Sequence, residues 1–70
     1  MQGSVAQNIR EARRRIGITQ AELSKQVNMH RNTIINFETG RRDPKVKDLR
    51  KIATALNVPI EELISNSEQA

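Results

Sequence analysis

The stretch that decides the fold lies at residues 19–40 and reads TQAELSKQVNMHRNTIINFETG. Thr19 followed by Glu22 has the form of a capping box, in which a hydroxyl accepts a backbone N–H and a carboxylate returns a hydrogen bond. Leu23 and Val27 are four residues apart, so they fall on one face of a helix that begins near Thr19. We therefore predict a short helix from about Thr19 to Val27.

A second helix should follow almost at once, from about Arg31 to Thr39. Asn28 and Gly40 are residue types that adopt the left-handed backbone conformation in which helices commonly end. Ile34 and Phe37 would form the buried face of the second helix. Two short helices joined by a tight three-residue turn cross at a steep angle, so the second helix can protrude from a small domain.

The rest of the chain is also predicted to be helical, because apolar residues recur at helical spacing and no segment alternates with a period of two. Three further helices are expected, at about Val5 to Ile16, Val46 to Leu56 and Ile60 to Ile64. The apolar stripes of the two longer ones are Val5, Ile9, Ala12 and Ile16, and then Val46, Leu49, Ile52, Ala53 and Leu56. The predicted fold class is all-α, a compact bundle of five short helices.

The length of 70 residues allows one domain over residues 1–70, with ends at 1–4 and 65–70 that we expect to fray. Phe37 is the only aromatic residue, so the core must be built from aliphatic side chains. The chain has no cysteine, which excludes disulfides and thiolate metal sites and fits a reducing compartment. No apolar run approaches the roughly 18 to 20 residues that a membrane span needs, so we expect a soluble, cytoplasmic protein without a membrane partner.

The net charge of +4 is unevenly placed along the chain. Residues 1–27 hold five basic and two acidic residues, residues 28–50 hold six and three, and residues 51–70 hold one and three. A basic body with an acidic end suits a protein of which one side meets a polyanion. A basic balance that merely keeps a small domain soluble explains the charge about as well.

The second helix of the pair should present one face to solvent, made up of Arg31, Asn32, Thr33, Ile35 and Asn36. In the major groove of DNA, arginine donates two hydrogen bonds to guanine, asparagine pairs with adenine, and threonine offers a hydroxyl and a methyl group. Taken alone, such polar residues are usually a solvated helix face. Ile35 has two equally good interpretations, a contact with a thymine methyl group or the fringe of the core.

Four groups of residues carry a family resemblance: Thr19-Gln20-Ala21-Glu22-Leu23; Arg31-Asn32-Thr33-Ile34; Phe37-Glu38-Thr39-Gly40-Arg41-Arg42 with Pro44; and Ile52-Ala53-Thr54-Ala55-Leu56-Asn57-Val58 with Leu63. Together they resemble the phage repressor and Cro-type helix-turn-helix family, also called the XRE family, over roughly two thirds of the chain. The resemblance implies a lambda-repressor-like DNA-binding domain with its helix-turn-helix at about residues 19–39. It also implies a transcriptional regulator, in particular a repressor, that binds double-stranded DNA with its third helix in the major groove.

The resemblance implies roles for individual residues as well. In this family the glutamine that opens the second helix contacts a backbone phosphate and braces a base-reading side chain, and here it is Gln20. Basic residues after the closing glycine touch phosphate, which assigns that role to Arg41 and Arg42. The base-reading positions are Arg31, Asn32, Thr33 and Asn36, with Ile35 on the same face.

The chain departs from the family pattern at four positions. The family more often has glycine in place of Asn28, serine or threonine in place of His30, and serine in place of Lys45 and Pro59. Histidine is a poorer N-cap than serine, which weakens the start of the recognition helix. The ring of His30 can reach a phosphate instead.

The first helix carries several arginines on its expected surface, among them Arg10, Arg13 and Arg14. Arg10 and Arg14 share a face four residues apart, so a phosphate contact, which we assign to Arg14, is one interpretation. A solvated face is the other interpretation of this cluster.

A domain of this size reads few base pairs, so we expect a homodimer on a near-palindromic operator with half-sites on the order of 34 Å apart. The fifth helix offers apolar area away from the recognition helix and is the expected interface. Its candidate residues are Val58, Ile60, Leu63 and Ile64.

An alternative hypothesis is an antitoxin-like or adaptor protein that chiefly binds a partner protein, such as a toxin or a regulator. Ile35 and the acidic end of the chain motivate it. An enzyme is the least favoured class, because no nucleophile with a base, glycine-rich phosphate loop or metal cluster is visible. Glu61 and Glu62 are explained by the favourable field of a helix N-terminus, and His30 has no second ligand at metal-binding spacing. We therefore expect no cofactor and no metal.

Overall fold

The computed structural model describes residues 4–64, and this part of the chain folds into five α-helices without a strand. The helices are α1 (Val5–Ile16), α2 (Gln20–Val27), α3 (Arg31–Thr39), α4 (Val46–Leu56) and α5 (Ile60–Ile64). The predicted all-α bundle of five short helices is confirmed. Residues 1–3 and 65–70, most of the two ends that we expected to fray, lie outside the described residues.

The helix ends follow from the residues that cap them. The hydroxyl of Thr19 accepts a hydrogen bond from the backbone N–H of Glu22 at 3.0 Å, and the Glu22 carboxylate accepts one from the N–H of Thr19 at 2.8 Å. This is the predicted capping box. Asn28 ends α2 in the left-handed conformation with φ of 59°, as its residue type indicated. Ser4, which we had grouped with the fraying end, instead caps α1 by accepting a hydrogen bond from the N–H of Gln7.

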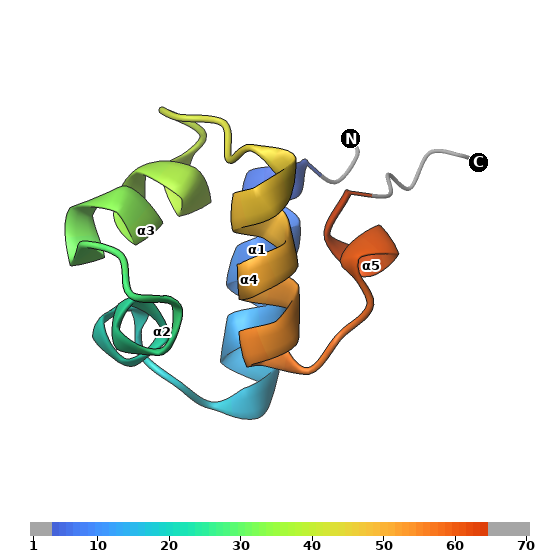
Figure 1. Cartoon of the computed structure of the whole chain (residues 1–70), viewed down its shortest axis with the longest axis horizontal. Helices are drawn as coiled ribbons and strands as arrows, with labels where there is room; N and C mark the ends of the chain where they lie inside the picture. Colours follow the sequence, from blue (N-terminus) through green and yellow to red (C-terminus); the bar gives the residue numbers. More distant parts are fainter. Residues whose placement is uncertain (1–3, 65–70) are drawn as a thin grey trace.

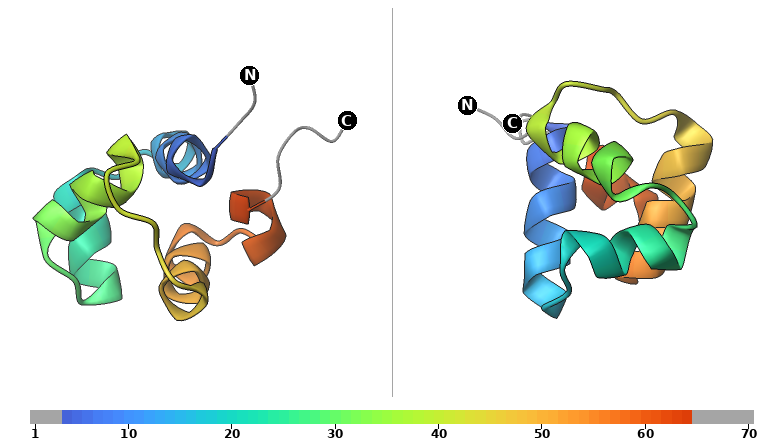
Figure 2. Two further views of the ribbon diagram at one scale, coloured as in Figure 1. Left: turned by 90° about the horizontal axis from the view of Figure 1, so that it is seen from above. Right: turned by 90° about the vertical axis from the view of Figure 1, so that its left-hand side faces the viewer.

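The five helices surround one core (Figure 1). In this view α4 lies in front of α1, α2 and α3 lie to one side of them, and α5 lies on the opposite side. Figure 2 shows in its right-hand view that α2 and α3 cross each other and form one face of the molecule, flanked by α1 and α4. The helix-turn-helix pair is therefore displayed on a single face.

The core is aliphatic around one aromatic ring, as the composition indicated. Its buried residues are Ile9, Ala12, Leu23, Val27, Ile34, Phe37, Leu49, Ile52, Ala53, Leu56 and Leu63. The predicted stripes were wrong at their outer ends, since Ile16 is 46% and Val46 60% exposed. Ile16 is the last residue of α1 and Val46 the first residue of α4, so both project past the packed part of their helices. Among the described residues, no helix has the length and apolar character needed to span a membrane.

Candidate nucleic-acid interface

The outward face of α3 gathers most of the residues that the sequence assigned to DNA contact. Ile34 and Phe37 are buried, which leaves the opposite side of this nine-residue helix turned away from the core. One polar depression on this side is lined by His30, Arg31, Asn32, Thr33, Asn36 and Arg42. Residues from the turn before α3, from α3 itself and from the loop after it thus meet at one surface.

The side chains on this face differ in exposure. Arg31 and Asn32, at the start of α3, are exposed, whereas Thr33, Ile35 and Asn36 are half-buried. The helix therefore presents its N-terminal turn most fully. This is the part of a recognition helix that lies against base edges in helix-turn-helix complexes.

The loop after α3 folds back onto the last turn of the helix. The backbone N–H groups of Arg41 and Arg42 donate to the carbonyl oxygen of Asn36, at 3.0 and 3.2 Å. Gly40 makes this possible with a φ of 80°, a conformation that glycine adopts without a Cβ penalty. The backbone of these two exposed arginines is thus held next to Asn36, one of the predicted base-reading residues.

The turn before α3 lacks a side-chain cap, as the histidine in this position suggested. His30 has the extended backbone conformation of an N-cap, but its ring makes no capping hydrogen bond. Its carbonyl oxygen accepts the N–H groups of Thr33 and Ile34 at 3.0 and 3.3 Å. The exposed imidazole is left facing the polar depression that it helps to line.

A buried carboxylate lies beneath this surface and was missed from the sequence. The side chain of Glu38 is 1% exposed and accepts two hydrogen bonds from the guanidinium of Arg13, from Nε at 2.7 Å and from Nη2 at 3.0 Å. The predicted surface position of Arg13 was therefore wrong. Glu38 stands four residues after Ile34 and next to Phe37, so the helical period itself places it on the buried face of α3. That spacing is the signal that would have found it.

Two further residues converge on Glu38. The amide Nε2 of Gln20 donates to the carboxylate Oε1 at 3.1 Å. Arg10 donates from Nη1 to the backbone carbonyl of Glu38 at 2.7 Å, so Arg10 is directed into the molecule. Of the two arginines considered for phosphate, Arg14 is the exposed one, although it does not line the depression at α3.

The expected dimer interface needs one correction. Leu63 is fully buried in the core, so it is not available to a second protomer and its assignment to the interface was wrong. Val58 and Ile60 are half-buried against the core, and Ile64 is 47% exposed. The carbonyl of Leu63 also accepts a hydrogen bond from the amide of Asn8 at 2.8 Å, which fastens α5 to α1.

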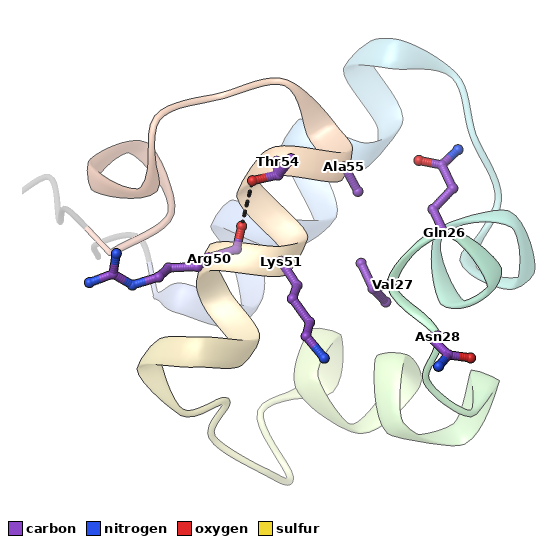
Figure 3. Close-up of a pocket in the computed structure, with 7 residues that line it drawn as sticks. All are labelled: Gln26, Val27, Asn28, Arg50, Lys51, Thr54 and Ala55. Atoms are coloured by element: carbon purple, nitrogen blue, oxygen red, sulfur yellow. Dashed lines mark hydrogen bonds between the residues drawn. The ribbon is translucent and has the colours of Figure 1, made fainter.

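A second hollow lies between α2 and α4 and shares no lining residue with the polar depression. It is lined by Gln26, Val27, Asn28, Arg50, Lys51, Thr54 and Ala55. In Figure 3 Lys51 extends into the opening while Arg50 points away, and the hydroxyl of Thr54 donates to the carbonyl of Arg50 at 2.9 Å. We call this hollow the α2–α4 groove. The sequence carries no signal for it, because its walls belong to helices that are not adjacent in the chain.

A helix-turn-helix on one face, with arginine, asparagine and threonine side chains on the outward side of its second helix, defines the class of DNA-binding domains. The chain belongs to the helix-turn-helix family, whose sequence profile matches residues 9–63.

Several transcriptional regulators are similar in sequence. A helix-turn-helix regulator of Archaeoglobus fulgidus is 44% identical over 55 residues, which cover 79% of each chain. The regulator ImmR of Bacillus subtilis is 32% identical over 65 residues, or 93% of this chain and 51% of ImmR. The cryptic phage CTXphi repressor RstR of Vibrio cholerae is 35% identical over 60 residues, or 86% of this chain and 54% of RstR. The chain thus spans about half the length of ImmR and RstR.

Solved structures show the same fold. The restriction-modification controller C.AhdI of Aeromonas hydrophila matches with a TM-score of 0.82 at 30% identity, over 86% of this chain and 91% of C.AhdI. The P22 c2 repressor, solved in complex with a synthetic operator, matches with a TM-score of 0.83 at 25% identity, over 90% of this chain and 96% of the repressor chain.

These similarities confirm the predicted membership of the phage repressor and Cro-type (XRE) family. They also confirm the predicted class of function, which is sequence-specific binding of double-stranded DNA in transcription regulation. The family and its structural neighbours are DNA-binding regulators and not enzymes.

Proposed function

We propose that this protein represses transcription by binding a near-palindromic operator as a homodimer, with α3 of each protomer in the major groove. The observation that carries the proposal is the polar depression at α3, where residues of the turn, the helix and the following loop line one surface. This arrangement suits a duplex, because base edges and the adjacent phosphates lie side by side along a groove.

Base recognition is assigned to the outward side chains of α3. The set is Arg31, Asn32, Thr33 and Asn36, with Ile35 placed to meet a thymine methyl group. Arg31 and Asn32 are the exposed members, so they reach furthest into the groove. Asn36 is half-buried and close to the loop arginines, so it reads a base near the phosphate backbone.

Phosphate binding is assigned to His30 and Arg42, which line the depression, and to Gln20, Arg41 and Arg14, which lie outside its lining. Each phosphate neutralised by a cation steepens the fall of log affinity with log salt by about 0.9. The backbone hydrogen bonds from Arg41 and Arg42 to Asn36 fix the register between phosphate and base contacts.

Dimerisation is assigned to the α5 side of the molecule, through Val58, Ile60 and the exposed Ile64. This side faces away from α2 and α3 (Figure 1), so a partner protomer there leaves the recognition face open. A symmetric dimer would place its two recognition helices about one helical turn of DNA apart, on the order of 34 Å.

The test compares two alanine variants on duplexes selected from a random pool by the unmodified protein. Asn36→Ala removes a base contact, so it should lower affinity for the selected operator by about 1–3 kcal/mol and relax the preference at one position. Arg41→Ala should weaken binding to all sequences alike and reduce the salt slope by about 1. Fluorescence anisotropy titrations at several salt concentrations measure both effects. Unchanged DNA affinity in both variants would contradict the assignment of this face.

A second candidate function is binding of a partner protein, and the α2–α4 groove favours it. Its lining combines the apolar Val27 and Ala55 with the cations Arg50 and Lys51, and includes no acidic residue. An acidic segment of a toxin or another regulator would suit such a surface. A stoichiometric partner that is lost on Lys51→Glu, together with DNA binding that is absent or insensitive to salt, would favour this function over the first.

A further inference from the structure

We propose that Glu38 is a positioning residue for DNA binding, because its buried carboxylate fixes which end of the Gln20 amide is turned inward and which atoms are left for DNA. The inference rests on the proposed phosphate contact of Gln20. Glu38 would thus contribute to the affinity for the operator although its buried side chain cannot itself contact DNA.

The geometry joins three helices at one carboxylate. Glu38 belongs to α3, Gln20 is the first residue of α2, and Arg13 lies on α1. Oε2 of Glu38 accepts from Nε of Arg13, while Oε1 accepts both from Nη2 of Arg13 at 3.0 Å and from Nε2 of Gln20 at 3.1 Å. The side chain is 1% exposed, so water does not compete for these oxygens.

A carboxylate paired with a guanidinium carries only acceptor atoms. The two ends of a glutamine amide have nearly the same shape, so packing alone does not choose between them. The carboxylate does choose, since it attracts the N–H₂ end and repels the carbonyl end. Gln20 is thereby held with nitrogen toward Glu38, and its oxygen and second N–H remain for other partners. A side chain that is already oriented loses less conformational freedom when it binds.

The ion pair with Arg13 does not need Gln20 for its own stability. Two of the three hydrogen bonds to the carboxylate come from Arg13, and Arg10 ties α1 to the same turn through the Glu38 carbonyl. The bond from Gln20 is thus the one that links this buried cluster to the proposed DNA face. Removing it should alter DNA binding more than folding.

The variant Glu38→Met tests this property because it keeps much of the volume and removes both acceptor oxygens. Glu38→Gln is less suitable, since the single oxygen of the new amide, in the place of Oε1, can still accept from both Arg13 and Gln20. In Glu38→Met no carboxylate selects the N–H₂ end of the Gln20 amide, so its orientation is no longer fixed. The variant also leaves Arg13 without its counter-charge, so its stability is measured beside its DNA affinity.

The test is a double-mutant cycle on operator affinity with Gln20→Ala, Glu38→Met and the double variant, each confirmed as folded by circular dichroism. We expect each single change to lower affinity about tenfold, a step of about 1.4 kcal/mol, and the double change to lower it by the same factor. A hundredfold loss in the double variant, or unchanged affinity in either single variant, would overturn the inference. The control is Glu62→Gln, which removes an exposed carboxylate paired with Arg15 and should leave affinity unchanged.

A second measurement covers the case in which Glu38→Met does not fold. In the unmodified protein, NMR should show two resolved side-chain amide protons for Gln20 with slowed solvent exchange, before and after DNA is added. Exchange as fast as that of an exposed glutamine would overturn the inference. Failure of the unmodified protein to bind any selected duplex would instead refute the proposed function, so the two failures are distinguishable.

Discussion

Replacing Arg13 by alanine should remove a large part of the protein's stability, whereas the same change at Arg15, two residues further along α1, should leave stability nearly unchanged. Both arginines make a 2.7 Å contact with a glutamate, so distance does not separate them. The two ion pairs differ in burial. The side chains of Arg13 and Glu38 are 11% and 1% exposed, against 61% and 38% for Arg15 and Glu62.

The magnitudes follow from this difference in burial. Removing one partner of a buried ion pair leaves an uncompensated charge and costs about 3–5 kcal/mol, whereas an exposed pair contributes about 0–1 kcal/mol. A domain of this length has a total stability of about 3.5–10 kcal/mol. Arg13→Ala therefore removes about 30% or more of the free energy of unfolding. It also loses the hydrogen bond from Arg13 Nη1 to the carbonyl of Ile18 at 2.8 Å.

The assay is urea denaturation followed by far-UV circular dichroism, with thermal unfolding in parallel. Both substitutions change helix propensity equally, because both replace arginine by alanine within α1. We expect the melting temperature of Arg13→Ala to fall by at least about 12 °C. A loss below about 1 kcal/mol, or an equal loss for Arg15→Ala, would refute the reasoning.

A further variant separates charge from packing. Arg13→Met combined with Glu38→Met removes both charges and keeps much of the volume, so no buried charge is left without a partner. Buried pairs replaced by apolar residues are often neutral in stability. The double variant should therefore be more stable than Arg13→Ala, and the opposite order would show that lost packing dominates.

The remaining predictions concern the recognition helix and α5. His30→Ser should raise stability by about 1 kcal/mol, as measured by thermal unfolding, because serine supplies the side-chain cap that α3 lacks. The same change should lower operator affinity in anisotropy titrations, because it removes the proposed phosphate contact of His30. Leu63→Ala should lower the free energy of unfolding in urea by about 2–5 kcal/mol because it opens a cavity in the core. A loss of stability below about 0.5 kcal/mol, as is usual for surface positions, would contradict the burial of Leu63. Ile64→Asp should change stability by less than about 0.5 kcal/mol but weaken self-association in sedimentation equilibrium; an unchanged dimer would exclude Ile64 from the interface.

The helices were predictable because their limits are encoded locally. Thr19, Asn28 and Gly40 set the ends of α2 and α3 through interactions within a few residues, and those interactions are present in the structure. The outward face of α3 could be predicted from the helical period, since Ile34 and Phe37 define the buried side of the helix. Local sequence therefore sufficed to place the base-reading candidates on one face.

The buried ion pair was not predictable by the same means. Arg13 and Glu38 lie 25 residues apart and belong to different helices, so their contact depends on how α1 packs on α3. A row of arginines on α1 suggests a solvated face when each is considered alone. The position of Glu38 beside Phe37 shows only that a charge is buried, while the identity of its partner is a property of the tertiary structure.

The short length of α3 explains why such a cluster lies beneath it. A nine-residue helix is not stable in isolation, so its orientation must come from packing against α1 and α2. Ile34 and Phe37 anchor it through nondirectional apolar contacts, whereas the hydrogen bonds of Glu38 fix its rotation and translation. Arg31 and Asn32, the proposed base-reading residues, take no part in this anchoring, so replacing them should leave the orientation of α3 unchanged, whereas replacing Glu38 should disturb it.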